Sequence, residues 1–167
     1  MTLGLLILRL VVGLTMAAHG SQKLFGWFGG YGLQGTGGFL EQLGFIPGRR
    51  NALFAGSAEF AGGLLLALGL ATPLAATLII SVMFVAIATV HVKHGYFNQN
   101  QGYEYPLLLG VVALTITIIG AGPISLDAAL NIHDSGPVWG IAALVAGLGG
   151  GAVQLATRRA PVAQKAS

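Results

Sequence analysis

The chain has 167 residues, of which 54% are hydrophobic and only 8% are charged. Soluble domains carry about 25% charged residues, because their surfaces must be hydrated. The composition therefore excludes a soluble globular domain and predicts that most of the surface faces lipid. The chain contains no cysteine, which excludes a disulfide, a thiolate metal site and a cysteine nucleophile.

Five apolar stretches approach the roughly 20 residues that a helix needs to span a bilayer. They cover residues 3–18, 52–70, 74–90, 105–120 and 138–156. Only three residues, ending in Pro73, separate the second stretch from the third, so these two should form an antiparallel hairpin. We predict an all-α transmembrane helical bundle.

The fifth stretch is rich in glycine, and Ala143, Gly147 and Gly151 recur on one face at four-residue spacing. Small residues let helix backbones approach closely in lipid. This face predicts homo-oligomerisation or contact with a partner helix. We divide the chain into a four-helix core (1–130), an accessory transmembrane helix (131–157) and a basic cytoplasmic tail (158–167).

The basic residues are distributed unevenly between the two predicted sides of the membrane. If all five stretches span, every lysine and arginine except Arg9 falls on one side, with the C-terminal tail. The residues are Lys23, Arg49, Arg50, Lys93, Arg158, Arg159 and Lys165. Because basic loops stay in the cytoplasm, we predict a multi-pass cell-membrane protein with its N-terminus outside and its C-terminus in the cytoplasm.

The long first connection, residues 20–51, is rich in glycine and aromatic residues. Aromatic rings favour the headgroup level of the membrane. Phe39, Leu40, Leu43 and Ile46 mark one face of a short helix that should lie along the interface.

Two ionisable residues, Arg9 and Glu59, fall inside predicted membrane helices. Such residues are costly in lipid and are functional candidates by default. Counting from His19 and Arg50 at the cytoplasmic side places both about 14–15 Å deep. Matching depth on neighbouring helices predicts an Arg9–Glu59 ion pair, either structural or functional.

A second polar group gathers near the cytoplasmic helix ends. His19 and Lys23 share a face at four-residue spacing, and His91 ends the third apolar stretch. Tyr103, Glu104 and Tyr105 open the fourth stretch. We predict that these residues, with Glu59 beneath them, form a ligand-binding pocket.

Three interpretations of this pocket compete. In the first, histidine and tyrosine bind the carbonyls of a quinone-like ring and Glu59 exchanges protons. In the second, histidine and carboxylate ligands bind zinc or iron, although no compact metal motif is present and we assign no metal site. In the third, the residues are ordinary interfacial anchors. We predict no intrinsic cofactor other than a quinone and no nucleic-acid partner, and we interpret Asp127, His133 and Asp134 as plain surface.

The same residues carry a resemblance to the DoxX family of small membrane proteins, extending over about residues 3–130. The motifs are Leu8-Arg9-Leu10, Ala18-His19-Gly20, Gln22-Lys23-Leu24-Phe25-Gly26, Ala58-Glu59, Gly62-Gly63, Val90-His91, Gly95-Tyr96-Phe97-Asn98 and Gly102-Tyr103-Glu104-Tyr105-Pro106. The resemblance implies a four-helix bundle and a link to oxidoreductase systems, some relatives being subunits of a thiosulfate:quinone oxidoreductase. The region after Leu130 departs from the family pattern.

These observations predict a membrane component of a redox or quinone-handling system, with other membrane or redox proteins as partners. Whether the chain is itself an enzyme is left open, and no residue is assigned as catalytic. Two alternatives are a non-enzymatic scaffold for other membrane proteins and a small transporter or proton-conducting protein.

Overall fold

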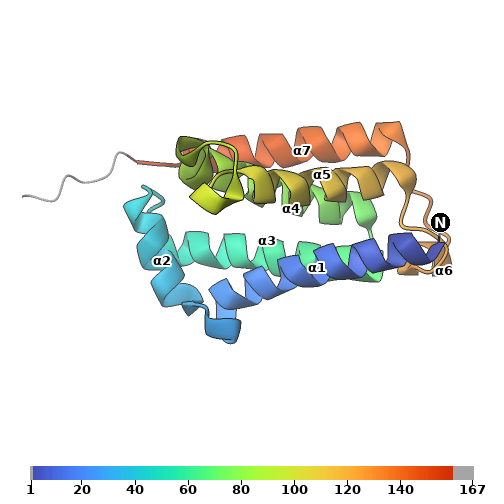
Figure 1. The fold of residues 1–167 in the computed structure, drawn as a ribbon, viewed down its shortest axis with the longest axis horizontal. Coiled ribbons are helices and arrows are strands. Elements are labelled where there is room, and N and C mark those ends of the chain that lie inside the picture. Colours follow the sequence, from blue (N-terminus) through green and yellow to red (C-terminus); the bar gives the residue numbers. More distant parts are fainter. Residues whose placement is uncertain (1, 160–167) are drawn as a thin grey trace, which may run out of the picture.

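The computed structural model describes residues 2–159. Lys165 and most of the predicted basic tail lie outside the described residues. The major helices are α1 (Thr2–Phe25), α2 (Gly32–Gln42), α3 (Gly48–Leu68), α4 (Thr72–Ala86), α5 (Glu104–Ile119), α6 (Leu126–Ala129) and α7 (Pro137–Ala156). Short segments complete the order: η1 (Trp27–Gly29), η2 (Ile87–His91), η3 (Val92–His94) and η4 (Asn98–Asn100). The prediction of an all-α helical bundle is confirmed (Figure 1).

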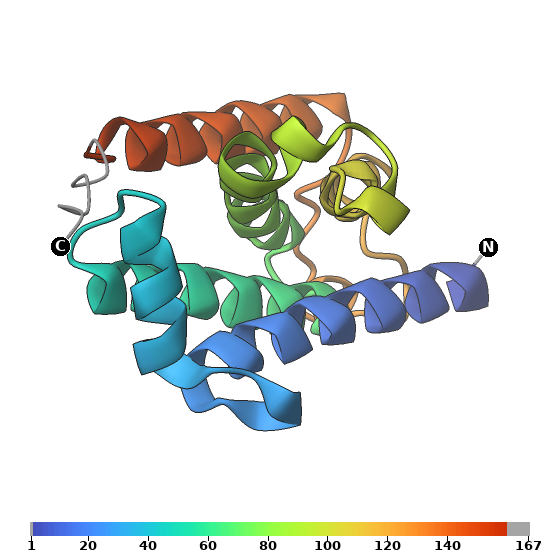
Figure 2. The same cartoon turned by 60° about the vertical axis from the view of Figure 1, so that its left-hand side comes forward.

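The five long helices lie side by side and alternate in direction along the chain (Figure 1). Helix α1 pairs with α3, and α4 packs between α3, α5 and α7. Helix α2 crosses one end of this bundle, and α6 lies at the other (Figures 1 and 2). We call these the α2 end and the α6 end. The predicted helix of this connection therefore exists, although it begins at Gly32 and ends at Gln42, before Leu43 and Ile46. Its position along the membrane interface stays a prediction.

Four helical segments are long and apolar enough to cross a membrane: α1, α3, α7 and Thr72–His94, which joins α4 to η2 and η3. Helix α5 is apolar but has only 16 residues, corresponding to about 24 Å. Helix α7, which the sequence predicts to be accessory, is thus long enough to span the membrane. Helix α5, the fourth predicted span, is the short one.

Helices α1 and α3 approach closely through glycine. A Cβ atom added at Gly13 would collide with the backbone of Gly63 and Ala67, and one at Gly20 would collide with that of Gly56 and Phe60. Small residues at this contact let the two backbones pack directly, which is how helices gain van der Waals contact in lipid. The contact fixes the register of α1 along α3.

Helix α7 uses its small-residue face within the chain. Ala143, Gly147 and Gly151 are buried. Cβ atoms added at Gly147 and Gly151 would meet Ile80 and Phe84 of α4. The prediction that this face mediates homo-oligomerisation is therefore wrong, because α4 of the same chain already covers it.

The α6 end is held by a buried carboxylate. Asp127 is only 6% exposed and accepts hydrogen bonds from the backbone N–H of Ala71 (2.7 Å) and Thr72 (3.1 Å) and from the Thr72 hydroxyl (2.6 Å). It thus satisfies free amides at the start of α4. The interpretation of Asp127 as plain surface is wrong, whereas His133 and Asp134 are exposed.

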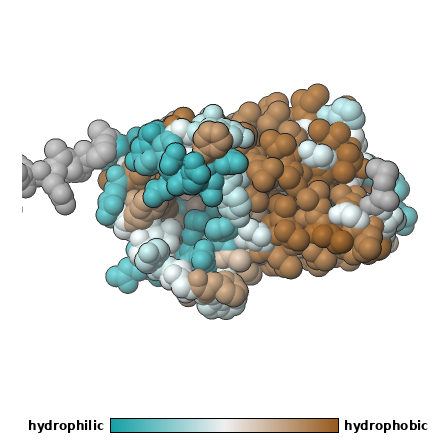
Figure 3. Space-filling model, in the orientation of Figure 1, coloured by the Kyte–Doolittle hydropathy of each residue, from teal (hydrophilic) through white to brown (hydrophobic). Residues whose placement is uncertain are grey.

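Hydrophilic residues gather toward the α2 end, while the helices beyond it present an apolar surface (Figure 3). The helix directions place Lys23, Arg49, Lys93 and Arg158 at or near this end, since they lie at the matching ends of α1, α3, η3 and α7. The apolar surface faces the lipid bilayer in a multi-pass membrane protein. The assignment of the α2 end to the cytoplasm stays a prediction of the positive-inside rule.

Gly147→Leu should lower the thermal stability of the protein in detergent, because its Cβ would stand 2.8 Å from Ile80 Cγ2 and overpacking typically costs about 1–3 kcal/mol. Gly149→Leu is the matched control, since nothing lies within 4 Å of its added Cβ. Equal melting temperatures for the two variants would contradict the α4–α7 packing.

A candidate intramembrane site around Glu59

Glu59 is the most deeply buried carboxylate of the described chain, with only 3% of its surface exposed. Its Oε2 accepts a hydrogen bond from Lys23 Nζ at 2.5 Å, and this is the single salt bridge within residues 2–159. The lysine side chain is 30% exposed. A charge-assisted bond of this kind offsets part of the cost of removing both charges from water.

The predicted Arg9–Glu59 ion pair is wrong. Arg9 Nη2 donates to the Ala67 carbonyl at 3.4 Å, so Arg9 lies level with a residue eight positions beyond Glu59 on α3, or about 12 Å along the helix. The predicted depth of Arg9 is counted from His19 and therefore assumes that α1 ends at His19. In the structure, α1 continues to Phe25. The continuation brings Lys23, rather than Arg9, level with Glu59.

Arg9 instead links chain segments at the α6 end through hydrogen bonds. It is 2% exposed and donates to the carbonyl oxygens of Ala121, Ala67 and Ile124, the last at 2.7 Å. These bonds join α1 to the end of α3 and to the connection between α5 and α6. They satisfy carbonyl groups at the end of α3 and in this connection, two of them buried.

His19 lies one helical turn from Lys23 on the same face of α1. It is half-buried, and the charges of Lys23 and Glu59 both act on its imidazole. Its ring centre is 6.1 Å from that of Tyr105, in the first turn of α5. Three helices thus contribute to one polar group: His19 and Lys23 from α1, Glu59 from α3 and Tyr105 from α5.

Lys23 also lines a hollow of about 650 Å³ at the α2 end. The hollow lies between the last turns of α1, the loop after it and α2, and its wall includes Gln22, Tyr31, Phe39 and Gln42. This volume falls in the range of small-molecule sites. Lys23 therefore connects the buried carboxylate on one side with a space large enough for a ligand on the other.

The remaining predicted site residues form a separate group in the loop between α4 and α5. His91 Nδ1 lies 2.7 Å from the Gln101 carbonyl oxygen, and Glu104 Oε2 accepts from the Asn98 N–H at 2.9 Å. The Tyr103 ring packs edge-on against Tyr96. Within residues 2–159, no hydrogen bond, ion pair or ring contact joins this group to Glu59.

Within the described residues, His91 and Glu104 hydrogen-bond to this loop, and the convergence of His19, His91 and Glu104 on one pocket stays a prediction. Each polar group in the loop binds a nearby backbone atom, which stabilises the loop itself. Sequence reasoning also missed η2, where the Thr72–His94 segment widens into a π-helix ending at His91. Such segments are frequent at functional sites, but the sequence contains no signal for this one.

In the described part of the chain, no three histidine or carboxylate side chains come close enough to hold a metal ion. The Glu59 site is built from hydrogen-bonding groups. It offers a cationic donor, a carboxylate, an imidazole and a phenol beside an apolar helix interior.

Comparison with known proteins identifies the class of protein. The model of the DoxX family matches residues 4–92, a shorter region than the predicted 3–130. A protein of Bacillus subtilis (strain 168), named "Putative oxidoreductase CatD", is 32% identical over 115 residues, which is 69% of this chain and 79% of that protein. The chain belongs to the DoxX family. No solved structure matches it.

Lys23→Met should lower the free energy of unfolding by about 3 kcal/mol, since it leaves the Glu59 carboxylate buried without a partner. The double variant Lys23→Met/Glu59→Leu should lose less than the sum of the two single changes, because it removes both charges. Unfolding in mixed micelles with increasing dodecyl sulfate measures these differences. Lys93→Met, an exposed lysine, is the control, and strictly additive losses would rule out the pair.

Proposed function

We propose that this chain is the membrane component of a redox system and that the Glu59 site binds a quinone-like ring. The observation that carries the proposal is the Lys23–Glu59 pair, in which a buried carboxylate positions a lysine at the wall of a ligand-sized hollow. The family membership and the oxidoreductase name of the Bacillus relative support the same general class.

The polar groups of the site match the needs of a quinone. A quinone carbonyl accepts hydrogen bonds, and Lys23 is a charged donor whose bonds are about twice as strong as neutral ones. Phe39 and Tyr31 in the wall of the hollow give the ring apolar contact. Such a combination of apolar walls with a few placed polar groups is typical of small-molecule sites.

Glu59 and His19 supply proton exchange in this proposal. Reduction of a quinone to a quinol consumes two electrons and two protons. Glu59 can deliver protons to the bound ring through Lys23, and His19, one helical turn from Lys23 but outside the lining of the hollow, can pass protons to this pair. The electrons come from a partner redox protein, which makes this chain the quinone-binding subunit of a larger assembly.

Fluorescence can test quinone binding, because the chain has two tryptophans. Trp27 lies in η1, beside the glycines that line the hollow, and Trp139 lies in the first turn of α7. With Trp139→Phe as the background, short-chain ubiquinone and menaquinone analogues should quench Trp27 saturably. Glu59→Gln and Lys23→Gln should weaken this binding about 10- to 100-fold, the worth of one charged hydrogen bond.

Asp134→Asn is the matched control, since this exposed carboxylate lies at the α6 end. It should leave the affinity unchanged. Saturable binding that survives both site variants would show that the ring sits elsewhere. No binding by the folded parent would contradict the proposal and favour a non-enzymatic scaffold, in which the Lys23–Glu59 pair serves only to hold α1 against α3.

A further inference from the structure

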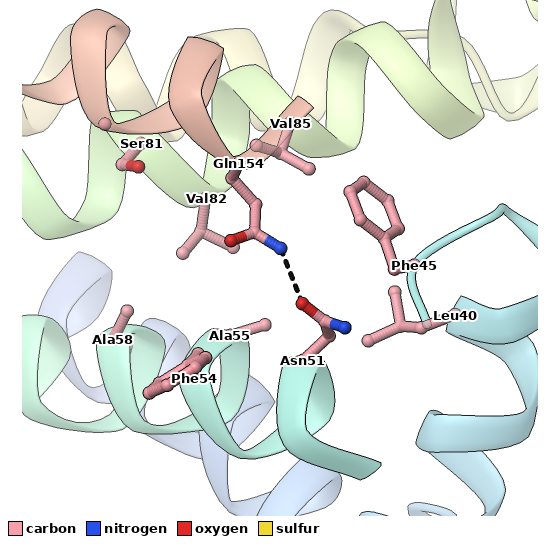
Figure 4. A pocket seen from close by; sticks show the side chains of 11 residues that line it. Leu40, Phe45, Asn51, Phe54, Ala55, Ala58, Ser81, Val82, Val85 and Gln154 are labelled. Carbon is pink, nitrogen blue, oxygen red and sulfur yellow. Dashed lines mark hydrogen bonds between the residues drawn. The ribbon is translucent and has the colours of Figure 1, made fainter. Parts of the chain in front are cut away.

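A second hollow lies on the opposite side of α3 from the Lys23 contact. It is a cleft of about 170 Å³ where α2, α3, α4 and α7 meet. Its walls are almost wholly apolar and include Phe45, Phe54, Ala58, Val82 and Val85 (Figure 4). Since Glu59 pairs with α1 while Ala58 faces α4 and α7, this cleft is independent of the proposed quinone site.

The cleft is narrow and runs along the helix axis. Its lining on α3 extends from Asn51 to Ala58, eight residues that rise by about 10 Å along the axis. Asn51 and Gln154 bridge α3 and α7 near the α2 end, with Gln154 Nε2 donating to Asn51 Oδ1 at 2.7 Å (Figure 4). The space thus has a polar mouth and an apolar interior, and it suits one hydrocarbon chain better than a peptide or a folded partner.

Two arginines stand over the aromatic walls of this cleft. The guanidinium carbon of Arg50 is 5.4 Å from the centre of the Phe54 ring, and that of Arg158 is 5.6 Å from the centre of the Phe45 ring. Arg158 is held further by its Nε, which donates to the Leu43 carbonyl at 2.9 Å. Both arginines are exposed, so their remaining donors are free to bind an anion.

The sole acidic residue of α2, Glu41, carries one negative charge, which the two arginines outnumber. Its Oε1 accepts the Gly48 N–H at 2.8 Å, at the joint between α2 and α3. The mouth of the cleft is therefore basic, at the end of the bundle where a membrane protein meets the headgroup layer. Basic pockets between helices at this level are typical sites for acidic lipid headgroups.

We propose that this cleft binds an anionic phospholipid, with one acyl chain between α3, α4 and α7 and the phosphate bound by Arg50 and Arg158. Guanidinium groups bind phosphate through paired hydrogen bonds, and the apolar walls replace contact with neighbouring lipid. An uncharged quinone would use the same walls and accept hydrogen bonds from the arginines, but it lacks the negative charge that a phosphate offers to two guanidinium groups. A lipid bound in this cleft would stabilise the packing of α2 and of the end of α7 against the bundle.

Native mass spectrometry of delipidated protein can test this inference. The parent should bind phosphatidylglycerol about 30-fold more tightly than phosphatidylcholine with the same acyl chains, the effect expected of two basic groups near a lipid headgroup. Arg50→Gln with Arg158→Gln should abolish this preference. Arg49→Gln is the control, because Arg49 is also exposed but contacts no wall of the cleft.

Filling the cleft tests the acyl-chain site separately. Gly150→Leu projects a side chain into the cleft and should weaken retention of both lipids, whereas Gly149→Leu, with open space around it, should not. Equal affinity of the parent for the two lipids would overturn the proposal without any variant. An Arg49→Gln loss as large as that of the double arginine variant would also overturn it, since it would indicate a diffuse surface charge.

Discussion

A charged carboxylate inside an apolar helical bundle needs hydrogen-bond donors or a positive partner, and the position of the positive partner of Glu59 organises the structure of this protein. Glu59 forms an ion pair with Lys23 because the glycines of α1 and α3 let the two helix backbones pack directly in one fixed register. A larger residue at Gly13 or Gly20 would separate the helices and leave the carboxylate unpaired, at a cost of several kcal/mol. The close helix contact and the ion pair therefore depend on each other.

The two ends of the bundle use buried polar groups differently. At the α6 end, Arg9 and Asp127 bind backbone atoms, which closes the helix ends and gives a structural role to both charges. At the α2 end, Lys23 binds Glu59 and also borders a hollow. At the α2 end a charged group borders a ligand-sized hollow, whereas Arg9 is held by backbone carbonyl groups, and this difference is why the functional proposal rests on Glu59 rather than on Arg9.

The overall architecture could be predicted from composition and the lengths of apolar stretches, because the bilayer sets both. The partners of the charged residues could not be predicted. A helix end shifted by one or two turns changes which side chains on neighbouring helices lie at the same depth. The apolar run suggests a helix end at His19, whereas the helix continues to Phe25, and this difference matches Lys23 to Glu59 in place of Arg9. The face of Ala143, Gly147 and Gly151 is recognisable from sequence as a packing face, but its spacing does not distinguish a helix of the same chain from one of another.

The direct test of the account is to map where a quinone binds. A photoreactive quinone analogue, cross-linked to the protein in lipid nanodiscs and located by mass spectrometry, should label the end of α1 around His19 and Lys23 and the adjoining wall of α2. Excess unlabelled quinone should suppress these adducts, and Glu59→Gln should reduce them. Adducts confined to the cleft between α3, α4 and α7, or spread over the lipid-facing surface without competition, would contradict the central claim that the Lys23–Glu59 pair builds the ligand site.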